Sequence, residues 1–198
     1  MPRKARLILT GMPHHIVQRG HNRSAVFVED NDYHYYLDNL AEWKMELGLE
    51  VYSYCLMTNH VHLIVKSNEN LGDIGKLMKR LAGRQTRYVN KKERRTGSLW
   101  EGRYKISPIQ TDEYLFQCCR YVELNPVKAR MVSIPEEYSW SSYSVKIGLN
   151  SSSWLDYDPC YLDLSVNDEH RQELYKKFVD YGISDVERQF IGQAVERN

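Results

Sequence analysis

Two strand-like runs, separated by only two residues, lie in the first third of the sequence. They cover residues 49–57 and 60–66, and Thr58 and Asn59 stand between them. Runs rich in β-branched and aromatic residues around a two-residue connection predict an antiparallel hairpin. The segments on either side of this hairpin then decide the fold.

Two further strands flank the hairpin in the sequence. Residues 14–19 form a short run that ends at Gly20, and the second half of residues 99–110 is also strand-like. A helix is expected next, beginning at a cap on Thr111 and stopped by Pro126, because proline disrupts a helix interior.

Helical periodicity fills both connections between the strands. Between residues 30 and 47 the apolar side chains step by three and four; Asp30 or Asn31 can cap this helix and Gly48 can end it. Asn70 can cap a second helix. The order strand-helix-strand-strand-helix-strand, followed by a helix, predicts a ferredoxin-like α+β fold, an antiparallel sheet backed by helices.

The pattern changes after about residue 132. Residues 1–132 are therefore assigned to one compact domain of the 198-residue chain. Residues 133–198 are expected to form a wrapped, irregular segment followed by two short amphipathic helices, near 167–181 and 184–196. This mainly helical C-terminal extension has no role that the sequence reveals.

Composition narrows the class of protein. Hydrophobic residues make up 42% of the chain, which suits a folded core, and no apolar run approaches the roughly 20 residues of a membrane helix. No secretory signal is expected, so a cytoplasmic location without membrane attachment is the prediction. The four cysteines lack CxxC spacing and are expected to be buried, reduced thiols.

Basic residues are concentrated in one part of the chain, although the net charge is only +1. Residues 76–105 contain eleven lysines and arginines and two glutamates, a local net charge of +9. Residues 151–198 contain ten acidic and five basic residues. This asymmetry predicts a surface that binds a polyanion, with an ordinary solvated helix face as the alternative.

Aromatic residues lie among these basic ones. Tyr88, Trp100 and Tyr104 can stack on bases while lysine and arginine contact phosphates, which predicts a groove for single-stranded nucleic acid. Gly20 allows close approach of a phosphate to the backbone, so its neighbours can form a second arm. The expected nucleic-acid-binding residues are Arg19, Arg23, Lys79, Arg84, Arg87, Lys91, Lys92, Arg103 and Lys105.

The candidate metal ligands lie in the segment NHVHLIV. Side chains alternate between the two faces of a strand, so His60 and His62 project to one side and Val61 and Leu63 to the other. Two imidazoles on one face can hold a divalent cation. The same spacing also occurs in exposed or core histidines, so these residues alone leave both interpretations open.

The candidate nucleophile lies in the segment RYVELNP. Tyr121 and Asn125 stand at i and i+4, on one helix face, and the amide oxygen of Asn125 can be a third metal ligand. A phenol one helical turn from a cation is what metal-assisted phosphoryl transfer to a tyrosine requires. Tyr88 is the main rival among 15 tyrosines, but its i+4 neighbour, Lys92, cannot bind a cation.

Several longer stretches resemble a known family. YCLMTNHVHLIV, GSLWEGRYK and RYVELNPVKARMV, with WSSY downstream, closely resemble the single-tyrosine transposases of the HUH nuclease superfamily, and within it the REP-associated tyrosine transposases. The resemblance extends from about His14 to Tyr143, with the three motifs in the family's order. Thr58 departs from the family, because many relatives have proline there, and the chain after Tyr143 matches nothing in it.

The resemblance implies a ferredoxin-like catalytic domain that cleaves and rejoins single-stranded DNA at hairpin-associated sites. It implies Mg²⁺ or Mn²⁺ as cofactor and a 5′-phosphotyrosine intermediate with a free 3′-hydroxyl. Residue by residue, His60 and His62 correspond to the paired ligands, Tyr121 to the nucleophile, and Asn125 to a third ligand that is often glutamine in relatives. Either a monomer or a homodimer is compatible with the resemblance.

Three other functions are considered. A domesticated protein could bind or nick repeated hairpins without mobilising itself. A regulator could bind nucleic acid with a decayed site, although intact His60, His62, Tyr121 and Asn125 argue against decay. An unrelated hydrolase could hold zinc at the two histidines, but the basic segment argues against a small neutral substrate.

Overall fold

A four-stranded antiparallel sheet forms the centre of the protein in the computed structural model, which describes residues 7–196. The strands lie in the order β2-β3-β1-β4, and each neighbouring pair is antiparallel. One helix connects β1 to β2 and another connects β3 to β4, which is the predicted ferredoxin-like α+β arrangement. The strands are β1 (Pro13–Arg19), β2 (Leu49–Met57), β3 (His60–Ser67) and β4 (Lys105–Pro108).

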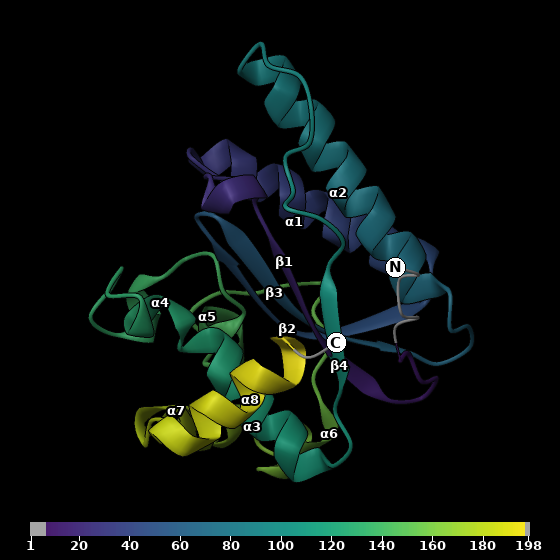
Figure 1. Ribbon diagram of the computed structural model, residues 1–198. Coiled ribbons are helices and arrows are strands. Elements are labelled where there is room, and N and C mark those ends of the chain that lie inside the picture. Colours follow the sequence, from purple (N-terminus) through teal and green to yellow (C-terminus); the bar gives the residue numbers. More distant parts are fainter. Residues whose placement is uncertain (1–6, 197–198) are drawn as a thin grey trace.

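Helices α1 (Asp30–Glu46) and α2 (Asp73–Lys92) cover one face of this sheet (Figure 1). Ile16 of β1 is paired directly with Leu63 of β3 and Ile106 of β4, so the three side chains share a face. All three are completely buried in the cluster that includes both helices. The main apolar core therefore lies between the sheet and α1 and α2.

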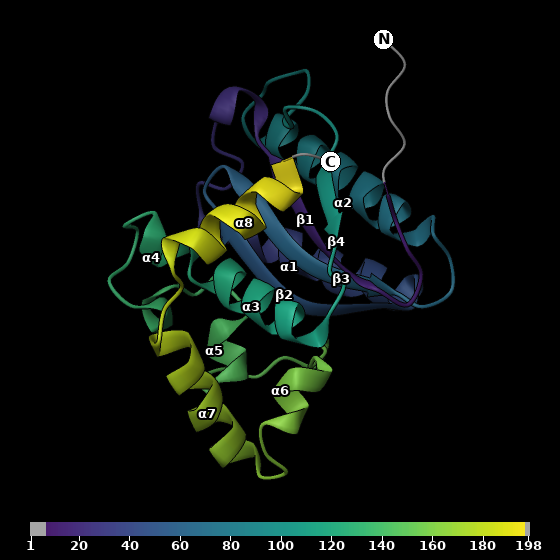
Figure 2. The ribbon, with the colours of Figure 1, turned by 60° about the horizontal axis from the view of Figure 1, so that its bottom comes forward.

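The opposite face of the sheet is also covered. Helices α3 (Asp112–Glu123) and α8 (Asp185–Glu196) lie in front of it in Figure 2. Ile64 of β3 packs there with Leu115 of α3 and Ile191 of α8 in a second buried cluster. The C-terminal helix thus contributes to the same layer as the helix that carries the candidate nucleophile.

Two expected helix limits are confirmed. The hydroxyl oxygen of Thr111 accepts a hydrogen bond from the backbone N–H of Tyr114 at 3.2 Å and caps α3. Gly48 follows the end of α1 with φ of +60°, a conformation that glycine adopts without steric strain.

Other helix limits differ from the prediction. Glu29 is the N-cap of α1, one residue before Asp30 and two before Asn31, the two expected caps, because the side chain of Asp32 accepts a hydrogen bond from the Glu29 backbone N–H at 3.0 Å. Helix α2 begins after Gly72 and not at Asn70.

Pro126 does not stop the chain from being helical. Helix α3 ends at Glu123, and a short helix, α4 (Asn125–Lys128), follows at once with Pro126 in its first turn. The backbone nitrogens of a first turn have no partner within the helix, so a proline there loses no hydrogen bond. The proline therefore marks a junction between two helices.

The C-terminal extension is mainly helical, as expected. The two predicted terminal helices are confirmed as α7 (Asp168–Asp180) and α8. The remaining short elements are the 3₁₀ helices η1 (His21–Arg23) and η2 (Pro135–Glu137) and the helices α5 (Tyr143–Lys146) and α6 (Pro159–Asp163).

The first part of this extension protects the sheet's β2 edge. The backbone N–H of Leu56 donates to Trp140 O at 2.9 Å, and the N–H of Ser142 donates to Tyr54 O at 3.0 Å. An uncovered edge strand invites pairing with other chains, and the WSSY segment removes that possibility here.

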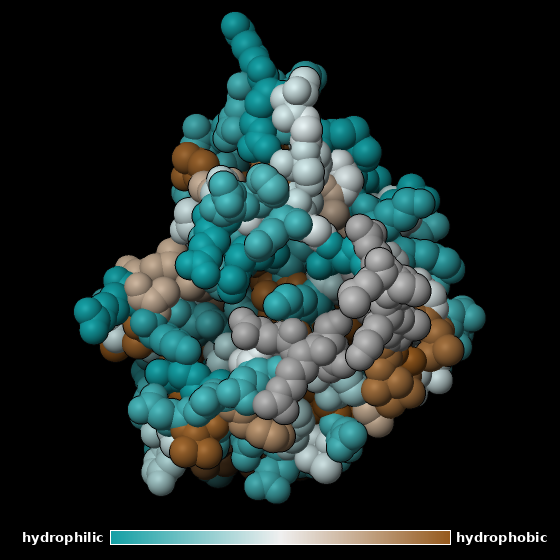
Figure 3. All heavy atoms as spheres, in the orientation of Figure 1, coloured by the Kyte–Doolittle hydropathy of each residue, from teal (hydrophilic) through white to brown (hydrophobic). Residues whose placement is uncertain are grey.

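Two further expectations concern the cysteines and the surface. Cys55, Cys118 and Cys119 are buried and Cys160 is partly exposed, all as free thiols. No helix formed by residues 7–196 combines the length and apolarity needed to cross a membrane. Hydrophilic side chains dominate the surface over α2 and the loop that follows it (Figure 3).

Candidate active site

Strand register brings polar side chains together on the sheet face under α3. His62 of β3 is paired with Val17 of β1, and His60 with Arg19. Residues two apart in a strand share a face, so His15 joins this group from β1. Lys105 of β4 is also paired with Val17. The prediction that both histidines share one face is therefore confirmed, and a third histidine lies beside them.

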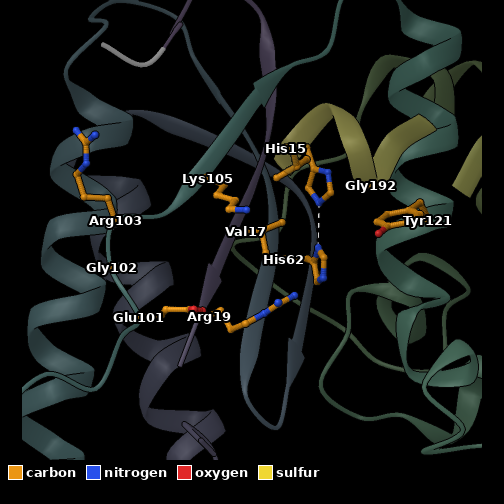
Figure 4. Close-up of a pocket in the computed structure, with 11 residues that line it drawn as sticks. His15, Val17, Arg19, His62, Glu101, Gly102, Arg103, Lys105, Tyr121 and Gly192 are labelled. Atoms are coloured by element: carbon orange, nitrogen blue, oxygen red, sulfur yellow. Dashed lines mark hydrogen bonds between the residues drawn. The ribbon is translucent and has the colours of Figure 1, made fainter. Parts of the chain in front are cut away.

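Tyr121 points from α3 toward these histidines (Figure 4). The centroid of its ring lies 5.7 Å from that of His15 and 6.0 Å from that of His62. The rings of His60 and His62 are 5.0 Å apart. Tyr121 thus lies beside His62 within one chain, and His60 lies next to His62 but is not among the described residues that line the cavity around Tyr121.

The space around Tyr121 is a cavity of about 410 Å³. Its lining residues come from strands β1, β3 and β4, from helices α3 and α8, and from the loop before β4. Lys105 and Arg19 point toward the imidazole wall, which suits a phosphate-containing ligand, whereas the guanidinium of Arg103 turns away from it at the rim (Figure 4). The lining residues are His15, Val17, Arg19, His62, Glu101, Gly102, Arg103, Lys105, Tyr121, Gly192 and Val195.

The ring of His60 is held by its neighbour in the β2–β3 turn. Its Nδ1 lies 2.6 Å from the amide oxygen of Asn59, while the amide nitrogen of Asn59 donates to the carbonyl oxygen of Arg23 at 3.0 Å. An amide oxygen only accepts, so the His60 proton is on Nδ1 and Nε2 keeps its lone pair. Burial, with the charge of Arg19, lowers the pKa of His60 to about 4, so the ring is neutral at pH 7.

His62 is held by His15, a residue that the sequence did not single out. The two rings are stacked, and Nε2 of His15 lies 3.0 Å from Nδ1 of His62. His15 is 2% exposed, and burial lowers its pKa to about 3. Burial also holds the pKa of His62 well below 6.5, with further lowering from nearby positive groups. Because Nδ1 of His62 is occupied, only Nε2 remains for a ligand.

These donors fit a divalent cation. Both histidines present a neutral imidazole with Nε2 available, which is the form that binds a metal. Among residues 7–196, no three or more His, Cys, Asp or Glu side chains gather closely enough to hold a metal ion. A cation here therefore needs oxygen ligands beyond His60 and His62, and an amide oxygen, water or phosphate can supply them.

Asn125 follows Tyr121 by four residues, but the predicted single helix is wrong, because α3 ends at Glu123 and Asn125 is the first residue of α4. Asn125 is also not among the described residues that line the cavity. Its amide nitrogen donates to the carbonyl oxygens of Tyr121 at 2.9 Å and Val122 at 3.3 Å. These bonds fix the amide against the end of α3 and turn the nitrogen away from ligand binding. The oxygen is the atom left for the predicted role.

The expected DNA-binding residues fall into two groups. Arg19, Arg103 and Lys105 line the cavity. Arg23 follows Arg19 closely in the sequence and is exposed on η1. The other five are on α2, which covers the opposite face of the sheet because its apolar side packs into the main core. Those five are Lys79, Arg84, Arg87, Lys91 and Lys92.

Two members of the α2 group are held by carboxylates. Arg84 forms an ion pair with Glu42 of α1, and Lys92 pairs with Glu29 at 3.0 Å and Asp32 at 2.6 Å. Their charges are partly neutralised by these partners. The exposed side chains of Lys79, Arg87 and Lys91 are the stronger candidates on this helix.

The expected stacking of bases on Trp100 and Tyr104 is wrong. Trp100 is 5% exposed and Tyr104 9% exposed, and the indole N–H of Trp100 donates to Ala82 O at 3.2 Å. Both side chains belong to the main core. Tyr88, the rival nucleophile, is stacked on Tyr35 with ring centroids 4.3 Å apart, on the α2 side of the sheet.

Helix α8 contributes the residues that sequence patterns could not indicate. A Cβ atom on Gly192 would lie 3.6 Å from the hydroxyl oxygen of Tyr121, and Val195 lines the same cavity. The backbone of α8 therefore lies beside the phenol at this position, within ordinary contact distance. No local signal in the C-terminal sequence points to this contact.

The family of the protein follows from comparison with known sequences. The family model described as IS200-like transposase matches residues 9–125, which include the candidate ligands and nucleophile. The chain belongs to this transposase family, and the relationship predicted from the three motifs is confirmed. No curated protein sequence matches the chain significantly.

Solved structures share the fold. A structure described as a REP-associated tyrosine transposase bound to a REP hairpin matches with a TM-score of 0.65 and 15% sequence identity, over 80% of this chain and 99% of that one. A putative transposase from Deinococcus radiodurans R1 has 21% identity and a TM-score of 0.42, over 62% of this chain and 96% of that one. The first likeness shows that the α+β fold extends over most of the chain.

Proposed function

We propose that this protein is a DNA transposase that cuts and rejoins single-stranded DNA at hairpin-associated sites, with Tyr121 as the nucleophile. The observation that carries the proposal is the position of Tyr121, whose ring lies 6.0 Å from His62 in a cavity that also contains three basic side chains. Family membership supports transposase activity in general, without its site or its mechanism.

The reaction is a phosphoryl transfer to tyrosine. The phenolate oxygen of Tyr121 attacks the phosphorus of the scissile phosphodiester, and the bond from phosphorus to the 3′ oxygen breaks. The departing 3′ oxygen takes a proton, which leaves a 3′-hydroxyl and a 5′-phosphotyrosine. Attack by a 3′-hydroxyl on that phosphotyrosine re-forms a phosphodiester and releases the tyrosine, which is strand transfer.

The cavity supplies charge where the reaction needs it. Arg19 and Lys105 point into the cavity, where they would neutralise the phosphate and favour the added negative charge of the transition state, and Arg103 at the rim would contact the strand further away. His60, His62 and the amide oxygen of Asn125 would hold Mg²⁺ or Mn²⁺. Such an ion, when bound, polarises the phosphate and favours the phenolate over the phenol, whose ordinary pKa is near 10.

DNA is the proposed partner, and its contacts divide between two faces. The strand being cut contacts the cavity, while Lys79, Arg87 and Lys91 on α2 contact other phosphates of the same DNA. The solved structure of similar fold is described as bound to a REP hairpin, which supports a hairpin as the substrate. Because His62 and Tyr121 meet within one chain, a monomer is sufficient for the chemistry.

The test is covalent capture. Wild-type protein is mixed with labelled hairpin DNA and Mn²⁺ and analysed on a denaturing gel, with 5′- and 3′-labelled substrates in parallel. Tyr121→Phe should bind DNA with near wild-type affinity yet form neither adduct nor nick, because only the attacking oxygen is lost. Tyr88→Phe is the matched control, and it should form both.

Each alternative has its own result. An adduct in Tyr121→Phe would assign the nucleophile to another tyrosine. Cleavage by wild type without an adduct would indicate a water nucleophile, as in a metal hydrolase. Hairpin binding with neither cleavage nor adduct would indicate a protein that only binds DNA.

A further inference from the structure

A fully buried network of charged side chains lies at the end of α3, the helix that carries Tyr121 and is called the catalytic helix below. At its centre is Glu123, the last residue of α3, which is 0% exposed. Its Oε1 accepts hydrogen bonds from the hydroxyls of Ser142 at 2.6 Å and Ser53 at 3.1 Å. Its Oε2 accepts from the hydroxyl of Tyr175 at 2.6 Å. All these partners are themselves buried.

Lys146 supplies the positive charge of the network. Its ammonium lies 3.4 Å from Glu123 and 3.6 Å from Asp158, and all three side chains are 0% exposed. Burial favours the neutral amine, but Cys119, Glu123 and Asp158 together raise the pKa of Lys146 above its ordinary value. The ammonium also donates to the hydroxyl of Tyr175 at 3.3 Å.

Most partners of Glu123 come from the C-terminal extension. Ser142 belongs to the WSSY motif, Lys146 to α5, and Tyr175 to α7, while Ser53 comes from β2. Glu123 is therefore one point at which the extension and the sheet both hold α3. Arg120 of the same helix is another link to the extension, because it pairs with Glu187 of α8 at 3.2 Å. A carboxylate with this many buried partners is costly to move, because any displacement leaves donors or charges unpaired.

Glu123 is only two residues from Tyr121. Each residue turns an α-helix by about 100°, so the two side chains leave α3 on sides roughly 200° apart. Tyr121 enters the cavity, and Glu123 enters the network. Neither Glu123 nor Lys146 lines the cavity, so neither reaches a bound DNA strand.

We propose that Glu123, Lys146 and Tyr175 form a clamp by which the C-terminal extension positions Tyr121 for attack. The clamp sets the position and rotation of α3 over the sheet, and with them the distance from the phenol to the histidines. Glu123 is thus a positioning residue. The proposal rests on the proposed role of Tyr121 and gives the extension a function in the reaction.

The test compares two carboxylates that tie the extension to the rest of the protein. Glu123→Ala removes the tie to α3. Asp156→Ala is the matched control, because Asp156 ties the same extension to Lys44 of α1 and to the backbone N–H of Val51 in β2, at 2.6 Å. Both substitutions delete one partly or fully buried acceptor, and only the first touches the catalytic helix.

Three quantities are measured for each variant. They are the rate of adduct formation at saturating hairpin DNA with Mn²⁺, the affinity for the DNA, and the hydrogen exchange of α3 compared with β1 and β3. Glu123→Ala should lower the adduct rate at least ten-fold without changing DNA affinity, and exchange should rise in α3 alone. Asp156→Ala should leave the adduct rate of folded protein and the α3 exchange unchanged.

Two results would overturn the clamp. One is an adduct rate for folded Glu123→Ala within two-fold of wild type. The other is an equal rise of exchange in α3, β1 and β3, since that would indicate general loss of stability. If Glu123→Ala does not fold, Glu123→Gln replaces it, because Gln keeps the size, and Lys146 keeps its pairing with Asp158. Gln lacks the charge that pairs with Lys146 and replaces one acceptor oxygen by a donor, so an unchanged rate and exchange there would also overturn the clamp.

Failure of the proposed function gives a different result. If wild-type protein forms no adduct with any hairpin, Tyr121 is not the nucleophile under those conditions. The hydrogen exchange comparison still decides whether Glu123 anchors α3 selectively.

Discussion

Replacement of His15 tests whether the third histidine prepares His62 for a metal ion. When Nε2 of His62 binds a cation, Nδ1 must carry the proton and donate it to Nε2 of His15, 3.0 Å away. His15→Phe keeps a ring of similar size in this buried position but removes the acceptor. The Nδ1–H of His62 would then be buried without a partner whenever the metal is bound.

The expected magnitude follows from that lost acceptor. A buried donor left without a partner costs about 1–3 kcal/mol, and 1.4 kcal/mol corresponds to a factor of ten in affinity. Residues that orient a metal-binding histidine typically change metal affinity by 10- to 100-fold. We therefore expect His15→Phe to weaken Mn²⁺ binding about 10- to 100-fold, measured by calorimetry on protein first stripped with EDTA.

His14 provides the matched control. It is the adjacent residue, is 0% exposed and belongs to the opposite face of the sheet, where its Nε2 accepts from the backbone N–H of Leu9 at 3.1 Å. His14→Phe should disturb folding to a similar degree and leave Mn²⁺ affinity near that of wild type. Equal losses in both variants, or no loss in His15→Phe, would refute the orienting role of His15.

Three further predictions follow from the site. A mixture of Tyr121→Phe and His62→Ala proteins should form no adduct, because both groups act within one chain; restored activity would indicate exchange of α3 between subunits. The unfolding free energy should fall as pH drops below about 6.5, by roughly 1.4 kcal/mol per pH unit for each buried histidine. The reason is that histidines of the unfolded chain bind protons in this range, whereas burial lowers the pKa of His15 to about 3 and that of His60 to about 4 in the folded protein. Urea titrations in EDTA that give the same unfolding free energy between pH 6.5 and 4.5 would contradict this. Neutralising exposed α2 side chains should lower the slope of log K against log salt by about 0.7–0.9 per lost phosphate contact, and neutralising ion-paired ones should change it less. Fluorescence titrations on hairpin DNA compare the first set, Lys79, Arg87 and Lys91, with the second, Arg84 and Lys92.

Local patterns in the sequence determined most secondary-structure elements and the side of a strand on which the candidate metal ligands lie. Alternation along a strand was enough to place His60 and His62 on one side, and the four-residue spacing was enough to place Asn125 near Tyr121, although the two residues belong to different helices. The order of strands and helices was enough to predict the sheet, because few topologies accept that order. Each of these relations involves residues close in the chain or a rule about connections.

Relations between distant segments were decided only in the tertiary structure. His15 meets His62 through the register of β1 against β3, which no local pattern specifies. Helix α2 has a basic side, but packing of its apolar side on the far face of the sheet separates most of that charge from Tyr121. The same packing buries Trp100, which the sequence presented as a surface for bases.

The C-terminal extension shows most clearly what the sequence alone could not determine. Its amphipathic pattern predicted two helices, and both are present as α7 and α8. Periodicity reports which side of a helix is apolar, but not which surface it covers. The surface that each helix covers depends on distant partners. Tyr175 of α7 contacts Glu123, and Gly192 of α8 lies beside Tyr121, and these residues become neighbours only when the whole chain is folded.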